Sequence, residues 1–348
     1  MALEPLLQLG GQLVSFWTLA LGGLAGGLTA GLFGVGGGVI VIPLLISLGI
    51  PPRLAAGSMN VAIISNAADA LVHDLPRRQV DWRLGLIMGL AAMAGGQAGT
   101  WALGALGKPL LVDQLIRGGF LILLVWLAVR LLRTRRPPGE RVRAWLALPL
   151  LRYHSPWQAE PVSAVAPLLV ALAGGLIAAL LGVGGGILYV PVLLAFFPKP
   201  IQDLIPVSQI AVLLGSLSVS TGHVLHTGNL DPRLVLILVL TGSVGTVVGS
   251  RLKTQLDSRV LERLLAVILL LAAARLTLQG LGAFGDTGVP GVPQGRQEWL
   301  AGFQAWCAQG TLQLWLGTVG LALGLTPVLS WLQHRVLDRL RRQDAAAR

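Results

Sequence analysis

Polar side chains recur along the apolar stretch 54–74. Spacings of seven, four and four residues separate four of them, which are Ser58, Ser65, Asp69 and His73. These spacings place them on one face of a helix. Hydroxyl groups can donate hydrogen bonds to an anion, and a buried carboxylate or imidazole can carry a proton. The stripe predicts either a pathway for a small charged molecule or hydrogen bonds between packed helices.

A similar polar stripe lies within the apolar stretch 204–226. Its members are Ser208, Ser216, Ser220 and His223. Amide side chains flank the two stripes, at Asn60, Asn66 and Gln209. The predicted substrate-binding side chains are Ser58, Asn60, Ser65, Asn66, Ser208, Gln209 and Ser216. The predicted proton-coupling candidates are Asp69, His73 and His223, with solvated interfacial histidines as the alternative for the last two.

Two glycine runs interrupt otherwise helical apolar segments. The candidate site residues in them are Gly34, Gly36, Gly37, Gly38, Gly182, Gly184, Gly185 and Gly186. Each glycine costs about 1 kcal/mol relative to alanine inside a helix, and in hydrocarbon the freed backbone groups must find partners. The half-helices that begin near Val39 and Ile187 present N–H groups suited to an anion. Close helix packing through small residues is the alternative.

The glycine runs also reveal an internal repeat. The first run and Pro43 precede the second run and Pro191 by 148 residues, and both prolines are assigned a structural role. Further pairs follow 150 residues apart, namely Asp81 with Asp231, His73 with His223, Gly95 with Gly245 and Gly99 with Gly249. Paired broken helices in a repeat are the main sequence signal for a transporter's binding site.

Apolar stretches of about 20 residues recur in both halves and predict membrane spans. The predicted fold is an all-α polytopic membrane protein. Its predicted regions are a first transmembrane repeat at 12–132, a basic cytoplasmic linker with an interfacial helix at 133–162, a second transmembrane repeat at 163–280, an outer loop at 281–310, and an extra span with a basic cytoplasmic tail at 311–348.

Basic residues indicate which side each loop faces, because Lys and Arg gather in cytoplasmic loops. The basic loops follow the segments that end near residues 74 and 132 in the first repeat, and near residue 250 in the second. Equivalent loops then face opposite sides, so the repeats are expected to be inverted. Each glycine-broken segment must form a re-entrant or spanning hairpin, with the N-terminus outside and the C-terminus cytoplasmic.

The composition excludes several classes of protein. Of 348 residues, 54% are hydrophobic and 12% are charged, against about 25% charged in soluble chains. The net charge of +11 lies in the loops expected on one side, which argues against nucleic-acid binding. The single Cys307, the absence of a P-loop pattern and the absence of metal-ligand spacing predict no metal and no cofactor. The partners expected are the lipid bilayer and a small anion, and a homo-oligomer is compatible with the sequence.

The glycine blocks carry a resemblance to a known family. Gly31-Leu32-Phe33-Gly34-Val35-Gly36-Gly37-Gly38 with Pro43, and Leu181 to Gly186 with Pro191, resemble the TauE/SafE family of membrane anion transporters. The resemblance covers about 12–280, and the stretch 281–348 departs from it. The resemblance to this family implies transport of sulfite, sulfonates or related anions across the cytoplasmic (inner) membrane.

The resulting prediction is a secondary transporter that is not an enzyme. It moves a small anion by alternating access around the paired glycine breaks, with proton coupling through Asp69 as one version. The alternatives are a passive anion channel and a membrane-embedded enzyme or assembly subunit. The lack of paired acids or a nucleophile–base motif weakens the enzyme alternative.

Overall fold

The computed structural model describes residues 6–9, 12–75, 80–106, 152–157, 162–197, 199–227 and 230–257, with isolated helical residues between 118 and 125 and between 259 and 274. The predictions for the interfacial helix, the outer loop, the extra span and the basic tail lie outside these residues. So does most of the apolar segment that the sequence predicts to end near residue 132.

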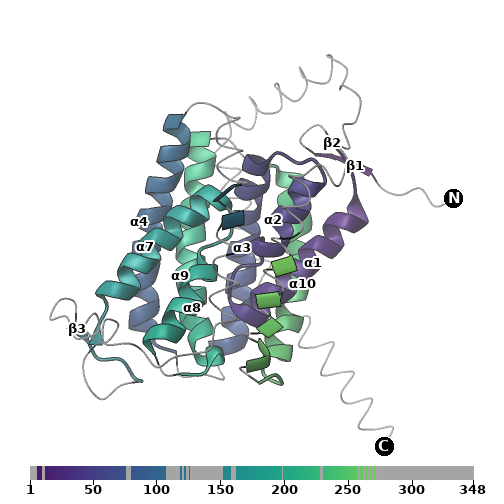
Figure 1. Ribbon diagram of the computed structural model, residues 1–348. Helices are drawn as coiled ribbons and strands as arrows, with labels where there is room; N and C mark the ends of the chain where they lie inside the picture. The colour runs from purple at the N-terminus through teal and green to yellow at the C-terminus, as the bar shows by residue number, and fades with distance from the viewer. Residues whose placement is uncertain are drawn as a thin grey trace, which may run out of the picture.

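The described chain is mainly a bundle of helices (Figure 1). The first half contains β1 (Leu6–Leu9), β2 (Gln12–Ser15), α1 (Phe16–Phe33), α2 (Gly38–Ser47), α3 (Pro52–Asp74) and α4 (Trp82–Leu106). The second half contains β3 (Arg152–Tyr153), β4 (Val162–Ser163), α7 (Val165–Leu181), α8 (Gly186–Phe196), α9 (Ile201–Gly222), the π-helical turn η2 (His223–Thr227) and α10 (Pro232–Lys253). The chain is mostly helical, as predicted, and two short antiparallel strand pairs, β1–β2 and β3–β4, accompany the helices.

The helix ends follow from local sequence. Pro52 and Pro232 occupy the first turns of α3 and α10, where the missing N–H costs nothing. The Asp231 side chain caps α10 by accepting from the backbone N–H of Arg233 at 2.9 Å. The Asp81 carboxylate does the same for α4, accepting from the N–H of Leu84 at 3.0 Å. The pair matched in the sequence therefore starts equivalent helices.

Each glycine-broken segment folds into an antiparallel helical hairpin. Along α1 and α2, Gly22 faces the side chain of Leu44, and Gly26 faces that of Val41. Along α7 and α8, Gly174 faces Tyr189, whose hydroxyl donates to the carbonyl oxygen of Ala171 at 3.2 Å. The hairpin is thus built twice from equivalent residues.

Each hairpin packs against a helix of the other half, α1 against α10 and α7 against α4. Gly27 of α1 lies directly on the carbonyl of Gly242 in α10, and the equivalent Gly175 of α7 lies on the carbonyl of Ala92 in α4. Because a Cβ atom at either glycine would collide with that carbonyl, small residues are needed for these helices to approach. Gly245 and Gly95 repeat the pattern from the other side, against Leu24 and Leu172.

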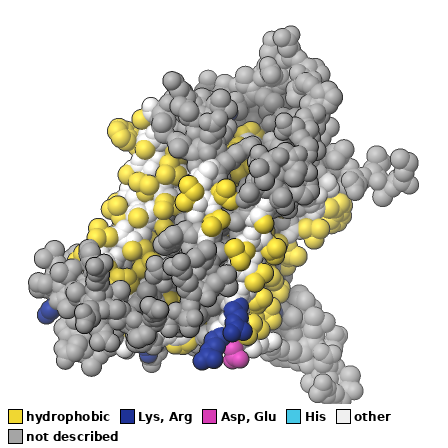
Figure 2. All heavy atoms as spheres, in the orientation of Figure 1, with side chains coloured by type: hydrophobic (Ala, Val, Ile, Leu, Met, Phe, Trp, Pro, Cys, Tyr) yellow, Lys and Arg dark blue, Asp and Glu magenta, His cyan; other side chains and the backbone are white. Residues whose placement is uncertain are grey.

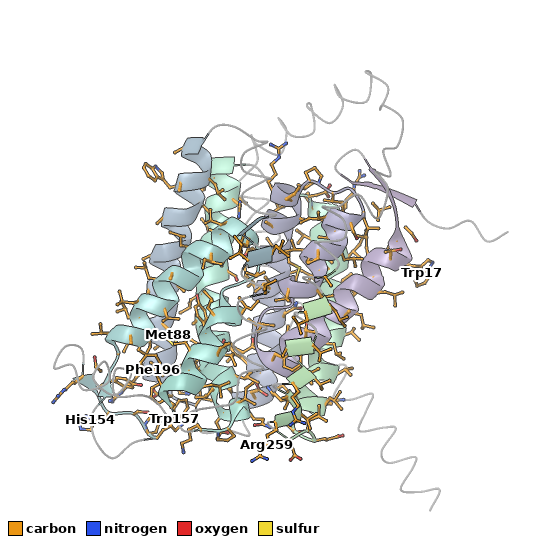
Figure 3. All side chains as sticks on the ribbon, viewed as in Figure 1. Trp17, Met88, His154, Trp157, Phe196 and Arg259 are labelled. Carbon is orange, nitrogen blue, oxygen red and sulfur yellow. The ribbon has the colours of Figure 1, made fainter. Side chains whose placement is uncertain are left out.

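The outer surface of the bundle is apolar. Hydrophobic side chains cover much of the described face in Figure 2, and the coloured charged side chains in that view gather toward its lower end. Trp17 of α1 is 60% exposed and points away from the bundle (Figure 3). Four described helices are long and apolar enough to cross a membrane: Phe16–Phe33, Trp82–Ala105, Ile201–Leu225 and Pro232–Lys253. The chain is therefore built as a multi-pass membrane protein.

Candidate functional site

The two glycine breaks lie against each other between the hairpins. The carbonyl oxygen of Gly182 is 2.7 Å from the position that a Cβ atom on Gly38 would occupy. Gly186 faces the carbonyl of Gly34 in the same way, which is the equivalent contact. Six glycines in the breaks have positive φ angles between 70° and 82°, at Gly34, Gly36, Gly37, Gly182, Gly184 and Gly185. Residues with a Cβ atom rarely adopt this conformation, so the sequence pattern is required by the backbone.

Three predicted site residues bind the carbonyl groups where α1 and α7 end. The Asn60 side-chain N–H group donates to the carbonyl oxygen of Ala178 at 3.4 Å. The Gln209 side chain donates to the carbonyl oxygen of Ala30 at 3.1 Å. The Ser208 hydroxyl donates to the carbonyl oxygen of Gly34 at 3.3 Å. Each bond joins one half of the chain to a helix end in the other half.

Asn60 and Gln209 form these bonds through their side-chain nitrogens, so their side-chain oxygens remain available to accept hydrogen bonds. Neither oxygen has a hydrogen-bond partner in the described part of the chain, although both side chains are fully buried. Apolar side chains complete the surroundings, because Ile63 of α3 contacts both Gly36 and Gly184. The predicted residues at the breaks thus combine buried glycine backbone, amide groups and an apolar wall.

The other polar residues of α3 face α10. The Ser58 hydroxyl accepts from the backbone N–H of Asp231 at 3.0 Å. The Ser65 and Ser243 hydroxyl oxygens lie 3.0 Å apart. Asn66 and Asp69, three residues apart, lie on the same side of α3. The polar stripe predicted on α3 therefore divides between the glycine breaks and the α3–α10 contact.

The remaining candidates on α9 are buried. Ser216 and Ser220 have hydroxyl oxygens with no hydrogen-bond partner in the described ranges. His223 begins the π-helical turn after α9 and lies beside the backbone of Ala179. The equivalent bonds of Asn60 and Gln209 are 149 residues apart, whereas the equivalent helix caps at Asp81 and Asp231 are 150 residues apart. The match of His73 with His223 stays a prediction.

A buried ion pair joins the ends of α3 and α10. The Lys253 ammonium group contacts the Asp74 carboxylate, and both residues are at least 98% buried. His73 Nδ1 lies 3.8 Å from the same carboxylate. The sequence analysis does not predict this pair, because Lys253 lies among the basic residues expected in a loop and Asp74 lies at the end of an apolar segment. Opposite charges in the last turns of two spans were the available signal.

The linker is held to the start of α4. Ser155 donates to the Asp81 carboxylate at 2.8 Å, and Trp157 stacks edge-on against Phe197 with ring centroids 5.6 Å apart. Figure 3 places Trp157 at the lower end of the bundle. Burial and the nearby Asp81 charge raise the pKa of Tyr153. Among the described residues, no group of three or more His, Cys, Asp or Glu side chains could hold a metal ion.

The sulfite exporter TauE/SafE family model matches residues 19–160 and 167–346. The chain belongs to the TauE/SafE family. The match continues well past residue 280, where the sequence motifs end, so the view that 281–348 departs from the family is wrong. The residues that match the TauE/SafE family model include both glycine breaks.

Curated relatives agree with the TauE/SafE assignment. A Bacillus subtilis (strain 168) protein named "Probable membrane transporter protein YunE" is 23% identical over 77% of this chain and 99% of its own length. A Xylella fastidiosa (strain 9a5c) "Probable membrane transporter protein" is 28% identical over 74% of this chain and 92% of its own length. "Sulfite exporter TauE/SafE family protein 3" of Arabidopsis thaliana is 31% identical over 29% of this chain and 22% of its own length. No solved structure matches with significance.

Proposed function

We propose that this chain is a secondary transporter that carries a small anion, such as sulfite or an organosulfonate, across the cytoplasmic membrane. The observation that carries the proposal is the direct contact of the two glycine breaks, at Gly38 with Gly182 and Gly34 with Gly186. Broken helices that meet within a repeat supply backbone groups to a substrate site while two bundles move around it. The names of the family and its relatives support the anion class.

The arrangement of the ends supports inverted repeats. In Figure 1, β2 precedes α1 at the upper right, whereas β3 lies at the lower left, ahead of α7. The described linker residues His154 and Trp157, and Arg259 after α10, all lie toward the lower end (Figure 3). Equivalent hairpins that enter from opposite ends are the geometry that alternating access requires. The lower end then corresponds to the cytoplasm by the positive-inside rule.

Alternating access predicts which groups should contact the anion. The N-terminal ends of α2 and α8, at Gly38 and Gly186, carry the positive ends of helix dipoles. The side chains of Asn60, Ser208 and Gln209 bind carbonyl groups beside these ends. Small movements of the hairpins would exchange these bonds for bonds to an oxyanion, so the amides and hydroxyl serve both states.

Transport is tested with purified protein in proteoliposomes. We expect saturable uptake of radiolabelled sulfite or a sulfonate, with faster uptake when the same unlabelled anion is inside. Saturation with counterflow supports a carrier, whereas linear uptake without counterflow supports a channel. Protein that is folded by its melting curve but moves no small anion would refute the proposal.

A further inference from the structure

Asp69 carries a carboxylate whose charge the described protein does not neutralise. The residue is 1% exposed, and neither carboxylate oxygen has a hydrogen-bond partner within the described ranges. An isolated charge in a protein interior or a membrane is costly, so such carboxylates pair with a cation or take up a proton. The buried Asp69 carboxylate therefore needs either a cation or a proton to neutralise its charge.

Among the residues that the structure describes, the neighbouring titratable groups do not supply that cation. Lys253 of the facing helix α10 is engaged with Asp74, and it follows Ser243 by ten residues, which is about 15 Å along a helix. His73, one turn beyond Asp69, lies beside the same Asp74 carboxylate. Helix α1 contains no titratable residue, and α9 contributes only Asp203 in its first turn.

Several oxygen atoms gather around Asp69 at the α3–α10 contact. The Asp69 carboxylate lies beside the Ser243 hydroxyl, which is 3.0 Å from the Ser65 hydroxyl. The Asn66 side-chain oxygen also lacks a hydrogen-bond partner among the described residues. It lies 2.7 Å from the position of a Cβ atom on Gly242, so it too faces α10. Four side chains thus bring five oxygens to the α3–α10 contact.

We infer that these oxygens form a binding site for a monovalent alkali cation, with Asp69, Asn66, Ser65 and Ser243 as its ligands. Carboxylate, amide and hydroxyl oxygens are the ligands that hard cations prefer. One carboxylate balances one positive charge, so the site is neutral with a monovalent ion and positive with a divalent one. A proton needs a single oxygen and gives no reason for four polar side chains to gather.

The other half of the chain provides an internal comparison. The equivalent positions hold Leu214, Gly215 and Ser218 on α9, and Ala92 and Met93 on α4. There the Ser218 hydroxyl donates to the carbonyl oxygen of Met93 at 2.8 Å, which satisfies it. The same helix contact therefore forms without a carboxylate, and the other polar side chain at this point, Gln97, donates to the Ser218 carbonyl oxygen at 2.9 Å. Packing does not require the oxygen cluster, which belongs to one half of the repeat.

This inference deepens the proposed function by naming the coupling ion, in place of the proton predicted from Asp69 alone. Its test measures ion binding and needs no anion transport, so the two proposals fail separately. Binding of radioactive Na⁺ to the full-length protein in detergent is measured by scintillation proximity at pH 7.5. The melting temperature is followed by tryptophan fluorescence in sodium, potassium or choline chloride at equal ionic strength.

We expect saturable Na⁺ binding and a higher melting temperature in sodium chloride than in choline chloride. Asp69→Asn should abolish both effects, and Ser243→Ala should weaken the affinity tenfold or more. The matched control is Ser218→Ala, which removes the equivalent hydroxyl of the second half and should leave Na⁺ binding unchanged. If Asp69→Asn does not fold, Ser243→Ala and Asn66→Ala carry the comparison.

Three results would overturn the inference. The first is a wild-type protein that binds no alkali cation. The second is a melting temperature that responds to pH but is the same in sodium, potassium and choline chloride, which would assign the cluster to a proton. The third is Na⁺ binding that survives undiminished in folded Asp69→Asn and Ser243→Ala.

Discussion

The carbonyl oxygen of Gly182 lies 2.7 Å from the place where a Cβ atom on Gly38 would stand. The equivalent contact joins Gly34 to Gly186, so each glycine break closes against the other. Neither hairpin can shift at this point without moving its neighbour. The contact makes the two halves of the bundle mechanically dependent on each other at the centre of the proposed site.

Filling this contact should destabilise the protein. Gly38→Ala adds a methyl group against the Gly182 carbonyl, and overpacking of this kind costs about 1–3 kcal/mol. The melting temperature of the purified protein should fall. The control is Gly118→Ala, because a Cβ atom there meets nothing within 4 Å. Equal melting temperatures for the two variants would contradict the close contact.

The side-chain amide of Gln209 should serve both the fold and the substrate. Gln209→Leu removes its hydrogen bond to Ala30, which is worth about 1 kcal/mol. If the amide also binds the anion, KM for uptake should rise severalfold while the maximum rate changes less. Asn60→Leu should behave alike, because its bond to Ala178 is equivalent. A lower melting temperature with an unchanged KM would limit both residues to a structural role.

The pair of Asp74 with Lys253 should be costly to break from one side. Lys253→Met leaves a buried carboxylate without its cation, and such changes typically cost about 3–5 kcal/mol. The double variant Asp74→Asn with Lys253→Met should regain much of the loss, because no isolated charge remains. Lys199→Met, at a partly exposed lysine, is the control and should change little. An additive double-mutant cycle would show that the pair contributes no coupling energy.

The cap of α10 should give stability a measurable pH dependence. Burial raises the pKa of Asp231, while the N–H groups of Arg233 and Leu234 and the charge of Arg233 oppose the rise. The folded state then binds this proton more tightly than the unfolded state does. The resulting stabilisation is complete below the unfolded pKa of about 4 and is lost as pH rises through the folded pKa.

Asp231→Asn keeps a capping side chain but removes the titration. The melting temperature of the wild type, measured upward from about pH 4, should fall more steeply than that of the variant. Parallel pH curves would show that Asp231 does not contribute.

Cysteine labelling tests whether the two repeats are inverted. In a Cys307→Ser background, Lys108→Cys reports the loop after α4 and Thr254→Cys reports the loop after α10. Inverted repeats place these loops on opposite sides, so an impermeant maleimide added to intact cells should label only Lys108→Cys. Labelling of both from outside would mean parallel repeats.

Sequence reasoning predicted the helices because apolar runs and their interruptions are local. The breaks at Gly34–Gly38 and Gly182–Gly186 lie where expected, with α2 and α8 beginning within one residue of Val39 and Ile187. The strands β1 and β2 were missed, although Gly10 and Gly11 between two apolar runs are a known hairpin signal.

The partners of side chains on other helices were not predictable in the same way. Asp69 is predicted from the sequence as a carboxylate within a span, whereas Ser243 lies among other small residues and nothing in the sequence distinguishes it. Their meeting depends on how α3 and α10 pack, and so does the pairing of Asp74 with Lys253. A single sequence specifies the periodicity of each helix, whereas the relative rotation of two helices depends on all their contacts.

The packing of α1 against α10 has a consequence for synthesis of the chain. Helix α1 ends at Phe33, but the helix that covers its glycine face begins at Pro232. At ~5–20 residues per second, a ribosome needs roughly 10–40 s to make the intervening chain. During that interval the α10 residues that cover Gly27 and Gly31 have not been made, so a nascent chain stopped after α4 would keep the α1–α2 hairpin but lack this helix contact. Biogenesis of this protein should therefore depend on factors that bind α1 in the membrane until α10 has been synthesised.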